Sequence, residues 1–179
     1  PKGIVITLPD AAALGKSVKA AIAAGIPVVS MNSGSDDYQS LGISAHVGQT
    51  EFEAGVGGGQ KMKAAGGKKA LCVNHEVGNV ALDRRCAGFK KGFGGSVDIL
   101  GTSNDPTEIQ KAVAAKLGGG YDTILTLGAG LSGEAALKAL EAAGKVGNVK
   151  LGTFDMSPNM LKAAAAGQVE FLIDQQQYL

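Results

Sequence analysis

Residues 71–89, LCVNHEVGNVALDRRCAGF, decide the fold, because an apolar strand, a polar turn and a helix follow one another there without interruption. Residues 71–73 are apolar, whereas five of the six residues 74–79 are polar or glycine. In open α/β sheets such a turn lies at the carboxyl end of a strand, where these folds bind ligands. Polar groups beside a core are costly unless something contacts them. The turn is therefore a candidate ligand contact, and a solvated loop with an asparagine helix cap is the alternative.

Strands and helices alternate regularly downstream of this stretch. Strands are expected to begin near residues 70, 97, 123, 149 and 170. Asp105-Pro106 and Ser157-Pro158 are typical helix starts, and Ser132 is expected to cap the helix between them. Five strands that alternate with helices predict an α/β fold with a parallel, doubly wound sheet and right-handed crossovers.

The first 48 residues do not continue this regular alternation of strands and helices. Residues 3–8 and 26–31 read as two strands around a helix capped by Asp10, and residues 43–48 as a short extended segment. Two parallel strands cannot form a stable sheet alone. We therefore expect two lobes.

The expected domain boundaries follow from this division. They are a partial amino-terminal lobe (1–48), a five-stranded carboxyl-terminal lobe (49–174) and the start of a return crossover (175–179).

The helix after Thr50 carries two local signals. Thr50 and Glu53 have the spacing of a capping box. Gly55, Gly58 and Gly59 follow, although glycine costs roughly 1 kcal/mol per helical position. We therefore expect another backbone to approach this helix closely.

Composition excludes several classes of protein. The 179 residues include 17 basic and 16 acidic side chains, so there is no basic face for nucleic acid. Apolar runs are too short to span a membrane. Cys72 and Cys86 fit either a buried thiol pair or a disulfide and fix no compartment. Because the chain starts at Pro1 rather than Met, we expect a fragment or a processed piece.

Catalytic motifs are matched only in part. Residues 128–133 (GAGLSG) fit a dinucleotide fingerprint, but on the third strand of their lobe rather than the first. Lys16-Ser17 lacks the first glycine of a phosphate-binding loop, and His75-Glu76 lacks the second histidine of a zinc helix. We predict no enzyme activity, no cofactor and no metal.

Polar side chains recur where the predicted strands end. Asn32, the 74–79 turn and Asp155 occupy such positions, and Gln175 follows the last strand. Amides and carboxylates donate to and accept from adjacent hydroxyl groups. This shared location favours a hydroxyl-rich ligand.

Seven short motifs occur in a fixed order: residues 3–6 (GIVI), 24–29 (AGIPVV), 47–49 (VGQ), 85–89 (RCAGF), 137–140 (LKAL), 154–155 (FD) and 173–175 (IDQ). Their order and spacing resemble those of ribose-binding-like periplasmic proteins, the type I sugar-binding proteins of ABC transporters. The effector domains of LacI-type repressors share this fold. The resemblance runs over essentially the whole chain.

The resemblance implies two lobes that close on a sugar, with the first strands of the amino-terminal lobe absent from this sequence. It places ligand contacts at Asn32, Asp83, Asp155 and Gln175, with Asn79 and Glu76 as neighbours.

Three positions depart from the family pattern. Asn32-Ser33 stands where ribose binders carry Asp-Arg, and Asp83 stands where they carry a ligand-binding arginine. The loop 128–130 lacks their asparagine. The resemblance therefore implies a pocket that differs from a ribose site.

The predicted function is solute binding for an ABC transporter. The chain would bind a sugar or sugar-like polyol between two lobes and deliver it to the membrane permease. We expect a monomer in the periplasm or at the cell surface of a bacterium, with a signal peptide in the full-length form. The alternative is the sugar-effector domain of a LacI-type transcription regulator, which the upstream sequence would decide.

Overall fold

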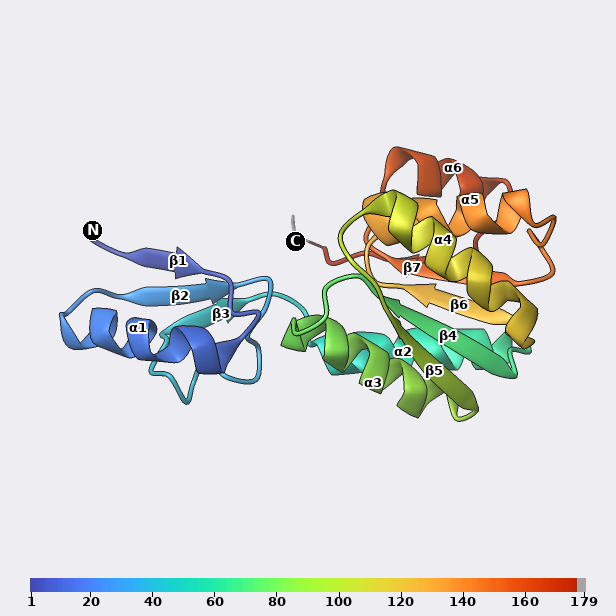
Figure 1. The fold of residues 1–179 in the computed structure, drawn as a ribbon. Coiled ribbons are helices and arrows are strands. Elements are labelled where there is room, and N and C mark those ends of the chain that lie inside the picture. Colours follow the sequence, from blue (N-terminus) through green and yellow to red (C-terminus); the bar gives the residue numbers. More distant parts are fainter. Residues whose placement is uncertain (177–179) are drawn as a thin grey trace.

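The computed structural model describes residues 1–176, which form two parallel β-sheets (Figure 1). One sheet has the strand order β1-β2-β3 and the other has the order β5-β4-β6-β7-β8. The strands are β1 (Ile4–Ile6), β2 (Val28–Met31), β3 (Ala45–Val47), β4 (Lys69–Asn74), β5 (Ser96–Gly101), β6 (Thr123–Thr126), β7 (Lys150–Phe154) and β8 (Phe171–Ile173). The predicted class, α/β with parallel, doubly wound sheets, is confirmed.

The three-stranded region contains one helix, α1 (Ala11–Ala23). The Asp10 carboxylate accepts hydrogen bonds from the backbone N–H groups of Ala12 and Ala13, at 2.8 and 3.0 Å, which confirms the predicted cap. The predicted extended segment, residues 43–48, contains a third strand, because β3 pairs with β2 in parallel register. Three residues are a short stretch for a strand, and pairing with β2 extends the sheet to a third strand.

The five-stranded region is covered by helices on both faces. Helices α2 (Glu51–Ala64) and α3 (Val80–Phe93) lie on one side, and α4 (Pro106–Lys116), α5 (Glu134–Ala142) and α6 (Pro158–Ala165) on the other (Figure 1). A short 3₁₀ turn, η1 (Leu117–Gly119), ends α4. Each face has its own apolar core, one around Phe89 and Leu125 and the other around Ile109 and Ile124.

Helices α2 and α3 touch through their backbones. A Cβ atom placed on Gly88 would overlap the carbonyl oxygen of Phe52, and one on Gly59 would overlap that of Phe89. The predicted close approach is therefore confirmed, and glycines from both helices make it possible. The predicted capping box was wrong, because the Thr50 side chain makes no cap hydrogen bond. The first turn of α2 is held instead by Glu51, which is buried against Arg85.

The caps of the later helices agree with the sequence in two cases out of three. The Asp105 carboxylate accepts from the Thr107 N–H at 2.7 Å, and Ser157 Oγ accepts from the Met160 N–H at 3.2 Å. Ser132 does not cap α5. It lies in a π-helical turn, η2 (Ala129–Gly133), where its hydroxyl donates to the Gly128 carbonyl at 3.0 Å.

The chain crosses between the sheets at residues 48–49, and residues 174–176 follow the last strand of the second sheet. The division into regions 1–48, 49–174 and 175–179 stays a prediction, and residues 177–179 of the predicted return crossover lie outside the described residues. Within residues 1–176, no helix combines the length and the apolar character needed to cross a bilayer.

Candidate ligand-binding site

The carboxyl ends of the two sheets face one another. In Figure 1 the arrows of β1 and β2 point toward the five-stranded sheet, and the arrow of β6 points back toward the three-stranded sheet. Two contacts join the facing edges near the start of α3. The Val80 N–H donates to the Pro9 carbonyl at 2.9 Å, and Arg84 forms an ion pair with Asp36. The loops at these edges can therefore contact a common ligand.

Three of the six predicted site residues form a hydrogen-bonded chain across this junction. Asn32 Nδ2, after β2, donates to Gln175 Oε1 at 3.3 Å, and Gln175 Nε2 donates to Asp155 Oδ1, after β7. Asn32 and Asp155 have φ values of 63° and 65°. This region is costly for non-glycine residues and is enriched at functional sites. The chain links polar groups from both sheets.

An open pocket of about 480 Å³ borders this chain. Asn32 and Gln175 line it together with Gly48 and Gln49 of the crossover. The pocket is large enough for a small organic ligand.

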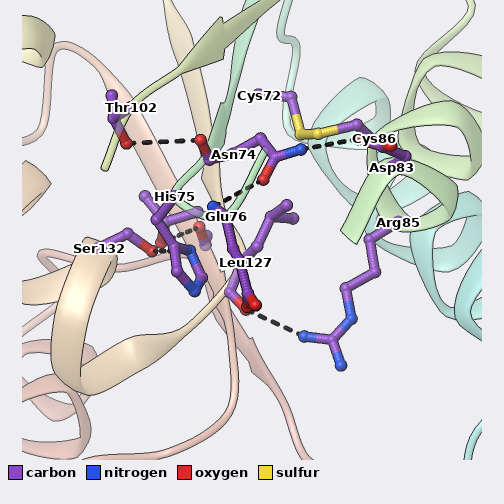
Figure 2. The surroundings of a disulfide bond; sticks show 12 residues. Cys72, Asn74, His75, Glu76, Asp83, Arg85, Cys86, Thr102, Leu127 and Ser132 are labelled. Carbon is purple, nitrogen blue, oxygen red and sulfur yellow. Dashed lines mark hydrogen bonds between the residues drawn. A yellow bond between two sulfur atoms is a disulfide. The ribbon is translucent and has the colours of Figure 1, made fainter. Parts of the chain in front are cut away.

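The other three predicted residues lie in the 74–79 turn and the first turn of α3. Figure 2 shows two of them, Glu76 and Asp83. Asn79 Oδ1 accepts from the Ala81 N–H at 3.0 Å, so Asn79 is a helix cap, and its Nδ2 donates to Glu76 Oε2 at 3.0 Å. Asp83 Oδ1 accepts from Asn74 Nδ2 at 2.8 Å. The six predicted residues therefore form two groups, and among the described residues no hydrogen bond joins these groups.

A disulfide anchors the turn to the sheet. Cys72 of β4 and Cys86 of α3 are bonded, with their Cα atoms 5.9 Å apart (Figure 2). This decides between the two alternatives that the sequence left open. Because Cys72 precedes the turn and Cys86 follows it, the bond fixes α3 against the strand from which the turn emerges.

Arg85 is a buried cation beneath the site. Its Nε and Nη2 donate to the Glu51 carboxylate at 2.5 and 3.2 Å, and its Nη1 donates to the Leu127 carbonyl at 2.9 Å. The guanidinium carbon lies 4.4 Å from the ring centroid of Phe154. The buried charges of Arg85 and Glu51 are therefore paired with each other and hydrogen-bonded, as burial of charge requires. Arg85 thus connects α2 and α3 to the end of β6, directly before Gly128.

His75 is a half-buried residue of the turn that the prediction of site residues did not include. Its Nδ1 lies 3.3 Å from Ser132 Oγ (Figure 2). Burial is the main cause that lowers its pKa from the usual value, and the Arg85 cation also lowers it. The carboxylates of Glu76 and Asp155 act in the opposite direction. In the sequence, the position of His75 directly after the buried strand is what could have indicated that it belongs to the site.

The Ser132–His75 contact is not a nucleophilic pair. Ser132 is fully buried, and its hydroxyl hydrogen is directed to the Gly128 carbonyl. A serine nucleophile must instead be exposed and hydrogen-bonded to its base.

Residues 1–176 also contain no group of three or more metal-ligating side chains positioned to hold an ion.

Comparison with known proteins identifies the family. The model of the periplasmic binding protein domain matches residues 1–179. The chain belongs to this family. No curated relative matches the chain.

Solved structures of sugar-transport binding proteins resemble the chain closely. A carbohydrate transporter from Acidothermus cellulolyticus 11B, in complex with myo-inositol, is 37% identical with a TM-score of 0.93, over 99% of this chain and 62% of that chain. A solute-binding protein from Burkholderia graminis C4D1M, in complex with D-arabinose, is 25% identical with a TM-score of 0.82, over 94% and 61%. A periplasmic sugar-binding protein from Legionella pneumophila is 24% identical with a TM-score of 0.84, over 100% of this chain and 69% of that chain. At this identity the match supports the fold alone.

These matches confirm the resemblance to periplasmic sugar-binding proteins of ABC transporters. The chain spans 62% of the length of the Acidothermus protein. The Acidothermus and Burkholderia proteins are transport proteins, so they do not favour the transcription-regulator alternative. The roles of the six site residues stay predictions.

Proposed function

We propose that this protein is the solute-binding component of a bacterial ABC transporter and binds a sugar or sugar-like polyol between its two sheets. The observation that carries the proposal is the hydrogen-bonded chain Asn32–Gln175–Asp155, which joins strand ends from both sheets beside the open pocket. The protein would act outside the cytoplasmic membrane as a monomer and pass its ligand to the permease. It would not be an enzyme.

The donors and acceptors at this junction suit a neutral ligand rich in hydroxyl groups. The Asp155 carboxylate accepts only, whereas the amides of Asn32 and Gln175 both donate and accept. A hydroxyl group can satisfy either kind of partner. When the site is closed, an analogue that lacks one hydroxyl leaves a protein group unpaired, which makes such a site selective.

The ring polyols are the first ligands to test. The 37% identical relative was solved with myo-inositol, and the 25% identical relative with D-arabinose. Both are neutral polyols, in keeping with a site built from one carboxylate and two amides.

The test is calorimetric titration of the full chain with myo-inositol and D-arabinose. Asp155→Ala should weaken binding by about 1.5–3 kcal/mol, the net value of a hydrogen bond to a charged group, or roughly 10- to 150-fold in Kd. Glu170→Ala is the matched control, because this exposed carboxylate precedes β8 at the opposite edge of the sheet.

Two outcomes would count against the proposal in different ways. If the wild-type protein binds none of the sugars, sugar binding itself is wrong. If it binds them and Asp155→Ala keeps its affinity, only the assignment of Asp155 is wrong.

A further inference from the structure

Three neighbouring strand ends carry a histidine, a glycine and an aspartate. His75 follows β4, Gly128 lies just beyond β6 and Asp155 follows β7, and these strands are adjacent in the order β4-β6-β7. A Cβ atom placed on Gly128 would lie 3.7 Å from His75 Nε2 and 3.7 Å from Asp155 Oδ2. The His75 imidazole and the Asp155 carboxylate thus lie on either side of the space above Gly128. Because β6 is followed by a glycine there, no side chain fills that space.

The hydrogen bonds around Ser132 assign the tautomer of His75. The Ser132 hydroxyl has one proton, and it donates this proton to the Gly128 carbonyl at 3.0 Å. Ser132 Oγ must therefore accept from His75 Nδ1–H, 3.3 Å away. In the neutral ring this leaves Nε2 as a free acceptor. Among the described residues Nε2 has no hydrogen-bond partner, and in Figure 2 it points away from Ser132.

The charges around the ring are consistent with a neutral imidazole at pH 7. The groups that act on it are Glu76 of the turn, Arg85 of α3 and Asp155 after β7. Burial is the main cause that lowers the pKa of His75, so the ring loses its proton below the usual pH. The gap above Gly128 is then bounded by two acceptors, Nε2 and the Asp155 carboxylate.

We propose that His75 is a specificity-determining ligand contact, whose Nε2 accepts a hydrogen bond from one hydroxyl of the ligand while Asp155 accepts from the neighbouring hydroxyl. The inference rests on the proposed function and narrows its ligand class to neutral polyols with hydroxyl groups on adjacent carbons. Gly128 is the positioning element, because any side chain there would fill the gap between the two acceptors.

The experiment is calorimetric titration with myo-inositol and D-arabinose at pH 7.5 and pH 5.0. Protonation turns Nε2 into a donor, so the wild-type protein should bind several-fold more weakly at pH 5.0. His75→Ala should weaken binding at pH 7.5 by about tenfold and reduce this pH dependence. His75→Asn should recover part of the affinity, because its amide oxygen accepts, and should also show reduced pH dependence.

His46→Asn is the matched control, because His46 is the other of the two histidines and lies in β3, bonded to Ser30. This variant should keep the pH dependence of the wild type. Thermal unfolding of each variant checks that it folds, and His75→Asn supplies the same comparison if His75→Ala does not.

The outcomes separate this inference from the proposed function. Wild-type binding with unchanged affinity and pH dependence in both His75 variants overturns the role of His75 and leaves sugar binding intact. A wild-type protein that binds neither polyol overturns sugar binding, and the role of His75 falls with it.

Discussion

The two sheets differ in how completely they are buried, although both supply polar groups to the same junction. In the three-stranded region one helix, α1, packs on the sheet, and Val5 and Val47 of its strands are 66% and 68% exposed. In the five-stranded region every residue of β6 is buried, and helices cover both faces. Burial of apolar surface is the main stabilising contribution in a fold. Within residues 1–176 the five-stranded region therefore buries more apolar surface, whereas the proposed site draws on both regions.

The largest expected effect comes from breaking the buried ion pair of the five-stranded region. Glu51→Ala leaves the Arg85 cation buried without its carboxylate and should lower the free energy of unfolding by about 3–5 kcal/mol. Urea unfolding measures this loss. Glu53→Ala, an exposed change in the same helical turn, should stay within about 0.5 kcal/mol of wild type. Equal losses in the two variants would contradict a structural role for the buried pair.

Removal of the disulfide should come next. The double variant Cys72→Ala/Cys86→Ala should lose about 2–4 kcal/mol, the usual cost of opening a native cross-link. Reduction of the wild type should have a similar effect, and the double variant should not respond to reductant. Hydrogen exchange should locate the loss in β4 and α3, and an equal loss in β1 and β2 would show that the two regions unfold as one unit.

The contact between α2 and α3 can be tested with two glycines. Gly88→Ala should destabilise the protein by about 1–3 kcal/mol, because the new Cβ would overlap the Phe52 carbonyl. Gly57→Ala in α2 meets nothing within 4 Å and should stabilise the protein by up to about 1 kcal/mol. Thermal unfolding of both variants measures the difference. Similar melting temperatures would mean that the helices can separate at little cost.

The smallest expected effect concerns the contact between the regions. Arg84 and Asp36 pair across the junction with side chains that are 41% and 40% exposed, so their coupling should be below about 1 kcal/mol. A double-mutant cycle with Arg84→Ala and Asp36→Ala measures it, and added salt should reduce it further. A coupling well above this value would show that the three-stranded region draws much of its stability from the larger one.

The regular part of the fold could be predicted because each element carries its own local signal. Asp10, Asp105 and Ser157 begin their helices as expected, and the polar turn does lie at the carboxyl end of β4. The rule that parallel strands end together was enough to predict that Asp155 and Gln175 lie at one sheet edge. Asn32 follows a strand of the other sheet, and the resemblance to two-lobed sugar-binding proteins assigned it to the same site. The structure places these three in one hydrogen-bonded chain.

What the sequence did not reveal depends on partners that are distant along the chain. The strand at β3 is decided by β2, and the disulfide by how α3 packs on β4. Serine is a residue type expected at a helix cap, but the Ser132 hydroxyl donates to the Gly128 carbonyl and contacts His75. The sequence places His75 directly after a buried strand, but its position beside Asp155 follows from the strand order and from the missing side chain at Gly128.

The backbone contact between α2 and α3 has a consequence for the evolution and engineering of selectivity. Two helices without intervening side chains, joined to β4 by a disulfide, leave the turn before α3 little freedom to shift. In the proposed site that side would act as a rigid surface, so a different ligand would have to be accommodated by exchanging side chains on it. Asn32 follows β2 of the less buried, three-stranded sheet, and its backbone is held there by one hydrogen bond, from its N–H to the Val47 carbonyl at 2.9 Å. Attempts to change ligand preference should therefore combine substitutions on the rigid side with loop variation around Asn32.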